Sequence, residues 1–172
     1  QETFPQGMTI LSGSTTIWDG SLGTYDDESS DISIGFPFNF YGTSYTSVRV
    51  STNGYITFHE AGGGTLNGTD YTNDAIPGIT EPDGFIAPWW DDLEIINQGS
   101  TDRVSYLLEG TAPNRIFTVE WYSVTNYSSA GSDWHYFQVK LYEGSDIIEL
   151  HYGIWSDDGT ESATVGIEKI DG

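Results

Sequence analysis

Hydrophobic and polar residues alternate with a period of two in a series of short runs that are rich in β-branched and aromatic residues. Clusters of Gly, Asn, Asp and Ser separate the runs, and no stretch shows the period of an amphipathic helix. The predicted strands cover residues 8–11, 31–36, 48–51, 55–58, 85–90, 103–108, 115–124, 136–142, 147–152 and 163–170. This pattern predicts an all-β fold, an antiparallel β-sandwich of about ten strands of the jelly-roll type, with under about a tenth of residues helical.

Two turns stand out between these runs. Asn53-Gly54 lies between two alternating segments and supplies the positive φ that a tight hairpin needs. Residues 143–146, Glu-Gly-Ser-Asp, have the composition of a second tight turn. The alternation also predicts which side chains face the core. The predicted core is Phe36, Phe38, Val48, Val50, Ile56, Phe58, Trp89, Phe117, Val119, Trp121, Phe137, Val139, Leu141, Ile148, Leu150, Val165 and Ile167, with Trp18 as a further core residue.

Two segments depart from the strand pattern. Residues 59–82 are rich in Gly and Pro and are predicted to form a long surface excursion. Residues 1–18 are polar and are predicted to form an N-terminal arm ahead of a single domain at 19–172. Within the arm, Met8, Thr9, Ile10 and Leu11 form the strand-like stretch. It is expected to pair with a sheet edge, either of its own domain or of a neighbouring copy.

The net charge of the chain limits the classes of molecule that it is expected to bind. The chain has 26 Asp and Glu against 5 Lys and Arg, a formal net charge of −21, so phosphate backbones and anionic membranes would repel it. It has no Cys and no apolar run of the ~20 residues that span a bilayer. The opening Gln1-Glu2 in place of Met is typical of a chain that has lost a secretory signal. We therefore expect a secreted or cell-surface protein, without nucleic acid or membrane insertion, and the lack of Cys favours a prokaryotic source.

Clustered carboxylates are candidate Ca²⁺ ligands, because this hard cation prefers oxygen donors on loops. The first candidate set is Asp91, Asp92 and Glu94, directly after the aromatic 89–90 pair, and the second is Asp26, Asp27 and Asp31. A third lies at Asp157, Asp158 and Glu161. None has EF-hand spacing, and solvated surface acids are the alternative.

Aromatic residues make up 15 % of the chain, and those on loops are candidates for stacking on sugar rings. The carbohydrate-stacking candidates are Trp134, Trp155, Tyr71 and Tyr127. The alternative is that aromatic residues only fill strands and core. Two N-glycosylation triplets begin at Asn67 and Asn126, both in predicted exposed loops.

A catalytic site is not predicted. The three His residues, His59, His135 and His151, are scattered, and none lies in a metal-ligand motif. The chain has no G-x-S-x-G nucleophile turn.

Several blocks carry a family resemblance. These blocks are, in order along the chain, residues 34–42 (IGFPFNFYG), 45–58 (YTSVRVSTNGYITF), 85–93 (FIAPWWDDL), 115–122, 137–153 and 163–168. In these blocks the chain resembles nidogen-like extracellular domains. The resemblance runs from Ile32 to Asp171 and leaves the arm outside. It implies a non-catalytic module of secreted or surface proteins, here assigned to the prokaryotic examples, and it assigns no binding residue.

Two functions follow. One is an adhesion or recognition module that contacts a matrix protein, another protein or a glycan at a cell surface. The other is a self-assembling subunit of an extracellular filament or pilus-like fibre, which polymerises by donating the Met8–Leu11 strand to a neighbour.

Overall fold

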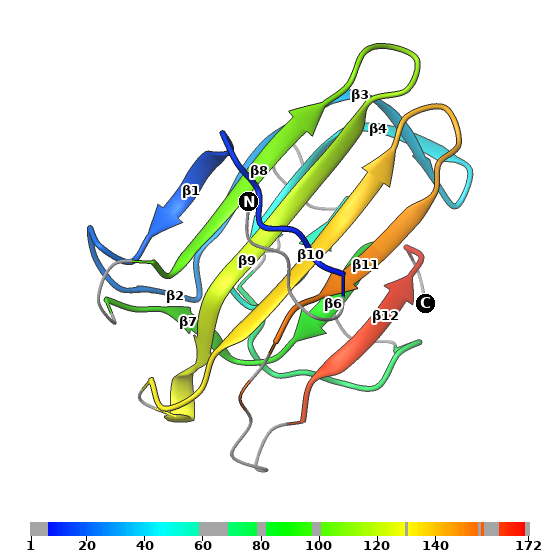
Figure 1. Ribbon diagram of the computed structural model, residues 1–172. Helices are drawn as coiled ribbons and strands as arrows, with labels where there is room; N and C mark the ends of the chain where they lie inside the picture. Colours follow the sequence, from blue (N-terminus) through cyan, green and yellow to red (C-terminus); the bar gives the residue numbers. More distant parts are fainter. Residues whose placement is uncertain are drawn as a thin grey trace.

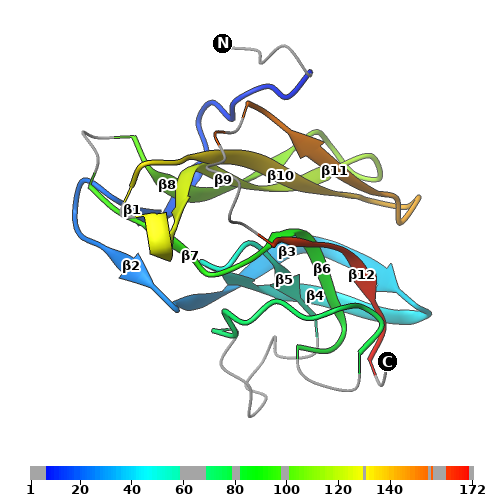
Figure 2. The ribbon, with the colours of Figure 1, turned by 90° about the horizontal axis from the view of Figure 1, so that it is seen from below.

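The computed structural model describes residues 7–58, 69–78, 82–97, 101–129, 131–154, 156 and 162–170, and within these ranges the chain forms two antiparallel sheets packed face to face (Figure 2). The predicted β-sandwich is confirmed. Twelve strands are present in the described residues, and the helical structure there is one 3₁₀ turn, η1 (Tyr127–Ser129). No described helix is long and apolar enough to cross a membrane.

One sheet has seven strands (Figure 1). Its main path runs β1 (Thr15–Asp19), β8 (Arg103–Glu109), β9 (Ile116–Asn126), β10 (His135–Tyr142) and β11 (Ile148–Tyr152). Two short strands extend it at one end, because β7 (Leu93–Ile95) pairs with both β9 and β2 (Tyr25–Asp26).

The other sheet has five strands in the order β12-β6-β5-β4-β3. These are β12 (Thr164–Glu168), β6 (Phe85–Trp90), β5 (Ile56–Thr57), β4 (Thr43–Ser51) and β3 (Ser29–Phe40). The predicted Asn53-Gly54 hairpin joins β4 to β5, and Gly54 has φ of 78°. A Cβ at Gly54 would lie 1.8 Å from the Trp89 carbonyl oxygen, so this turn requires glycine for space as well as for its backbone angle.

The core between the sheets largely confirms the predicted alternation. Twelve predicted core residues are buried, namely Phe36, Phe38, Val48, Val50, Ile56, Phe58, Phe117, Val119, Trp121, Phe137, Val139 and Leu141, and Trp18 is also buried. Trp89, Ile148 and Leu150 are half-buried and pack against this core. Val165 and Ile167 were predicted as core residues, and this is wrong: they are 48 % and 45 % exposed. Both lie on β12, the end strand of the five-stranded sheet.

A second, smaller core lies against the five-stranded sheet. Tyr55, Phe85, Ala87 and Trp90 form it, and Ile76 packs against them. The excursion contributes to this cover: Trp90 Nε1 donates to the Asp70 carbonyl oxygen (3.0 Å), and the Asp70 N–H donates to the Tyr55 hydroxyl (3.1 Å). Residues of β6 are therefore buried on both faces, which explains the nearly unbroken apolar run of this strand.

The N-terminal segment differs from its prediction. Residues 8–11 do not form a strand; Thr9 makes an isolated bridge, and the strand that follows is β1, which pairs with the edge of β8. Residues 7–14 cross the outer face of the seven-stranded sheet before β1 begins (Figures 1 and 2). We call residues 7–11 the arm from here on.

Candidate functional site

Three carboxylates meet at one end of the sandwich, beside the paired short strands β2 and β7. Asp26 ends β2, Asp27 follows with a left-handed φ of 52°, and Asp92 lies in the turn between β6 and β7. One oxygen of each carboxylate lies within 4.8 Å of the others. We call Asp26, Asp27 and Asp92 the acidic cluster.

Asn53 holds the parts of this site together. Its side chain is fully buried; Nδ2 donates to Asp27 Oδ1 (2.9 Å), and Oδ1 accepts from the Leu93 N–H (3.0 Å). Asn53 therefore fixes the Asp27 carboxylate relative to β7, which begins one residue after Asp92. The sequence marked Asn53 only as a turn residue, and no spacing signal linked it to carboxylates 26 residues before it or 39 residues after it.

The cluster is electrostatically unfavourable when all three carboxylates are ionised. Burial, with Asp26, Asp27 and Asp91 nearby, raises the pKa of Asp92 to about 6. Burial and the adjacent Asp27 charge likewise raise the pKa of Asp26, and its Oδ1 is buried without a hydrogen bond from any described residue. The arginines lie elsewhere, since Arg49, Arg103 and Arg115 pair with Asp31, Glu120 and Glu143. Hard oxygen donors without a neutralising partner among the described residues fit a divalent cation such as Ca²⁺.

The acidic cluster lines a cavity of about 270 Å³ together with Tyr71 and Tyr127. These tyrosines come from the excursion and from η1, and they are 51 % and 55 % exposed. The backbone ties η1 to the cluster, because the Tyr127 N–H donates to the Asp92 carbonyl oxygen (2.9 Å). Two of the four predicted stacking residues therefore lie beside three of the predicted metal ligands.

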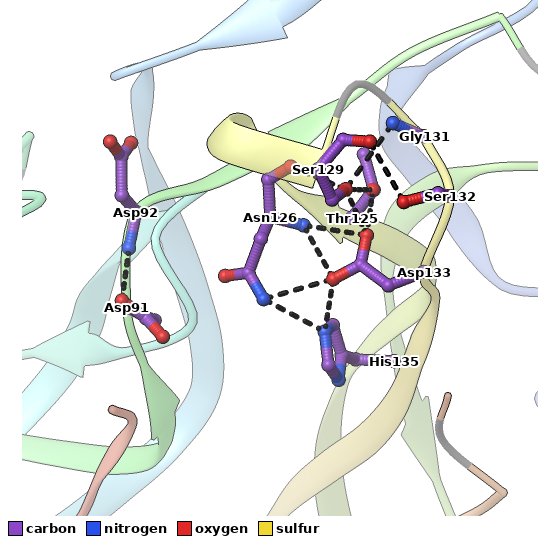
Figure 3. Close-up of polar contacts among 9 residues, drawn as sticks. All are labelled: Asp91, Asp92, Thr125, Asn126, Ser129, Gly131, Ser132, Asp133 and His135. Atoms are coloured by element: carbon purple, nitrogen blue, oxygen red, sulfur yellow. Dashed lines mark hydrogen bonds and ion pairs between the residues drawn. The ribbon is translucent and has the colours of Figure 1, made fainter. Parts of the chain in front are cut away.

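A buried polar network supports η1 from below (Figure 3). Asp133 accepts hydrogen bonds from the Thr125 and Ser129 hydroxyls and from Asn126 Nδ2 (2.9 Å), and its Oδ2 lies 3.1 Å from His135 Nε2. Figure 3 shows the Asp92 carboxylate pointing away from this network, while its backbone N–H donates to Asp91 Oδ1. The network fixes the position of Tyr127, whereas the acidic cluster faces the cavity.

The structure regroups the predicted metal ligands. Asp31, predicted beside Asp26 and Asp27, pairs with Arg49 (2.7 Å) on the neighbouring strand β4 and is not among the three clustered carboxylates. Asp91 caps the Asp92 N–H and is not part of the cluster. Glu94 lies opposite Asp26 in the β2–β7 pair, and burial together with the Asp26 charge raises its pKa. Asp157, Asp158 and Glu161 lie outside the described residues.

The other predicted residues fall elsewhere. Trp134 is 42 % exposed and bridges to Ser156, while Trp155, Asn67 and His59 lie outside the described residues. Placing Asn126 in an exposed loop was wrong: it ends β9, is buried, and uses its amide nitrogen to bond Asp133. His151 lies on β11 with Nε2 2.8 Å from Glu149 Oε2.

Comparison with known proteins gives three findings. A family model described as NIDO related matches residues 3–172, and so includes the arm that the sequence blocks had left outside. Alpha-tectorin from mouse is 26 % identical over 125 residues, and alpha-tectorin from human is 24 % identical over 125 residues. Each alignment covers 62 % of this chain but 6 % of the relative, so the chain spans a small part of these proteins. No solved structure matches the chain significantly.

Proposed function

Because the chain belongs to the NIDO-related family, we propose that it is an extracellular matrix-type module that contacts its partner through the acidic cavity, with Ca²⁺ held by Asp26, Asp27 and Asp92. The prediction of a nidogen-like domain is confirmed by the family match. Membership of this family supports the non-catalytic role that the sequence resemblance implied.

One observation carries the proposal. Three carboxylate oxygens lie within 4.8 Å of one another in a cavity whose rim is two exposed tyrosines. Repulsion among the three carboxylates destabilises the apo protein. A bound Ca²⁺ relieves this repulsion, and the relief contributes to the free energy of Ca²⁺ binding. Backbone carbonyls, water or a partner group complete the coordination, because Ca²⁺ takes six to eight oxygen ligands.

The tyrosines determine the kind of partner. Tyrosine presents a rigid apolar ring and a polar hydroxyl, which is why it is enriched in protein contact surfaces. We therefore favour a protein partner. A glycan is the second candidate, because Tyr71 and Tyr127 also offer ring faces, and a Ca²⁺ with open positions accepts sugar hydroxyls.

Calorimetric titration with Ca²⁺ tests the cation site. The wild-type protein should bind Ca²⁺, and Asp92→Asn should weaken binding by at least about tenfold, since it removes a charged ligand. Glu109→Gln is the matched control, because Glu109 is exposed at the far end of β8 and the substitution makes the same change in net charge. Equal affinities in the two variants would mean that Ca²⁺ binds only the diffuse surface charge.

A glycan array and a panel of immobilised matrix proteins, each probed with and without Ca²⁺, test the partner. We expect Ca²⁺-dependent binding to a protein that falls in Tyr71→Ala and Tyr127→Ala but not in Trp134→Ala. Binding to glycans alone would favour the second candidate. Binding unaffected by both tyrosine substitutions would overturn the cavity as the contact surface.

The filament function has less support, because it requires Met8–Leu11 to be donated as a strand, and these residues do not form a strand. We propose an extracellular location by analogy with the matched proteins. The prokaryotic source and glycosylation at Asn67 stay predictions.

A further inference from the structure

Besides the isolated bridge at Thr9, side chains of the sheet face bind the arm. Glu120 and Gln138 lie side by side on β9 and β10 and are fully buried. Glu120 Oε2 accepts from the Leu11 N–H (2.9 Å), and Gln138 Nε2 donates to the Thr9 carbonyl oxygen (2.8 Å). We call Glu120, Gln138 and the neighbouring Ser105 on β8 the arm site.

The arm site is a preorganised binding surface. Gln138 Nε2 also donates to Glu120 Oε2 (2.7 Å), and Arg103 Nη2 lies 3.3 Å from Glu120 Oε1, so the carboxylate is fixed from two sides. Both contacts to the arm go to backbone groups, and Met8, which is fully buried, provides the apolar anchor. A buried carboxylate that accepts a backbone N–H forms a strong, charge-assisted hydrogen bond.

The surface beneath the arm is polar, which lowers the free-energy cost of releasing the arm. Ser105 Oγ and Gln138 Oε1 are buried without a hydrogen-bond partner among the described residues. Water would hydrate these atoms, and Glu120 as well, if the arm left. An apolar surface would have no such compensation.

The link between arm and β1 has the features of a hinge. It consists of Ser12, Gly13 and Ser14; the first two are exposed, Gly13 has φ of 77°, and a Cβ at Gly13 would meet no atom within 4 Å. Because glycine adopts positive and negative φ readily, Gly13 can take the backbone angles that redirect the arm. Beyond the hinge, β1 stays paired with β8.

We propose that the arm site binds the arm of a second copy of this chain as well as its own, so that two copies associate by exchanging residues 7–11. The same contacts form in both states, because the arm brings identical backbone groups and the same Met8 to an identical site. This surface is separate from the acidic cavity, and neither proposal depends on the other. Exchange needs screening salt, since two copies of net charge −21 repel each other.

Shortening the hinge tests the proposal in the full chain. Deletion of Gly13 and Ser14 leaves one residue between arm and β1, too few for the arm to fold back onto its own site. We expect the mass measured by light scattering at moderate salt to double, with the β-sheet circular dichroism spectrum retained. Adding Met8→Asp to the deletion should return the protein to a monomer, because a charge cannot occupy the buried Met8 position.

A disulfide trap shows where the arm binds. The chain has no Cys, so Thr9→Cys with Gln138→Cys creates one defined pair. Oxidation should give a cross-linked monomer with the native hinge and a cross-linked dimer with the short hinge on a non-reducing gel. A folded, monomeric short-hinge protein, or a dimer that survives Met8→Asp, would overturn arm exchange.

Discussion

At the scale of single residues, the acidic cluster is costly for the apo protein. Asp92 has a pKa of about 6, above its ordinary value of 3.8, because burial and three neighbouring aspartates disfavour the charge. The folded state therefore binds this proton more tightly than the unfolded state. The stability that the group contributes is complete below about pH 4 and is lost as the pH rises through about 6.

Asp92→Asn should consequently stabilise the apo protein at pH 7. We expect a gain of about 1 kcal/mol, a value reduced for the partial solvent exposure of the carboxylate. The gain should vanish at pH 4, where the wild-type side chain is largely protonated. Urea unfolding in a chelator at both pH values measures it, and a loss of stability at pH 7 would contradict the electrostatic argument.

Asn53 is the residue on which the geometry of the cluster depends. Asn53→Ala leaves the buried Leu93 N–H without its acceptor and frees Asp27, so we expect a destabilisation of about 2 kcal/mol. Ca²⁺ affinity should fall in the same variant, although no ligand is removed. Asn114→Ala, in the exposed turn between β8 and β9, serves as the control for loss of an amide side chain.

At the scale of elements, the long alternating strands and the Asn53-Gly54 hairpin could be predicted, because side-chain period and turn chemistry are local properties. The short strands β2 and β7 could not: they have two and three residues, too few to show a period. Their pairing nevertheless brings Asp26 beside the turn that holds Asp92. The sequence thus named Asp26, Asp27 and Asp92 as candidate ligands in separate groups, while their meeting is a property of topology.

The hairpin glycine gives a prediction about this element. Gly54→Ala should destabilise the fold by more than about 4 kcal/mol, because the new Cβ would overlap the backbone of β6. Gly42→Ala is the matched control: Gly42 has φ of 85° but open space around it, so the cost should be about 1 kcal/mol. Chemical denaturation of both variants separates steric overlap from backbone strain.

On the end strand β12, in contrast to the Gly54 turn, substitutions should have small effects on stability. Val165 and Ile167 alternate as core residues do, but they lie on the last strand of their sheet. Ile167→Thr should therefore change stability by less than about 0.5 kcal/mol. Val139→Ala in the buried centre of β10 should cost about 2 kcal/mol, and equal effects in thermal unfolding would mean that β12 is covered in solution.

At the scale of the whole molecule, a net charge of −21 and a local cation site make separable contributions to stability. Salt screens the general repulsion among surface acids, since the Debye length falls to about 10 Å at 0.1 M ionic strength. A specifically bound ion instead stabilises the folded protein because it binds that state, and this stabilisation grows with the concentration of the ion.

Thermal unfolding in NaCl, MgCl₂ and CaCl₂ at matched ionic strength therefore distinguishes the two contributions. We expect NaCl to raise the melting temperature of every variant, and CaCl₂ to raise that of the wild type further, by several degrees. Mg²⁺ should act nearly as NaCl does, because it demands octahedral geometry and gives up its water reluctantly. Asp92→Asn should keep the response to NaCl and lose the additional response to Ca²⁺, whereas Glu109→Gln should keep both. If Ca²⁺ and Mg²⁺ raise the melting temperature equally in all three proteins, the divalent ions act only on the overall charge, and the acidic cluster is not a Ca²⁺ site.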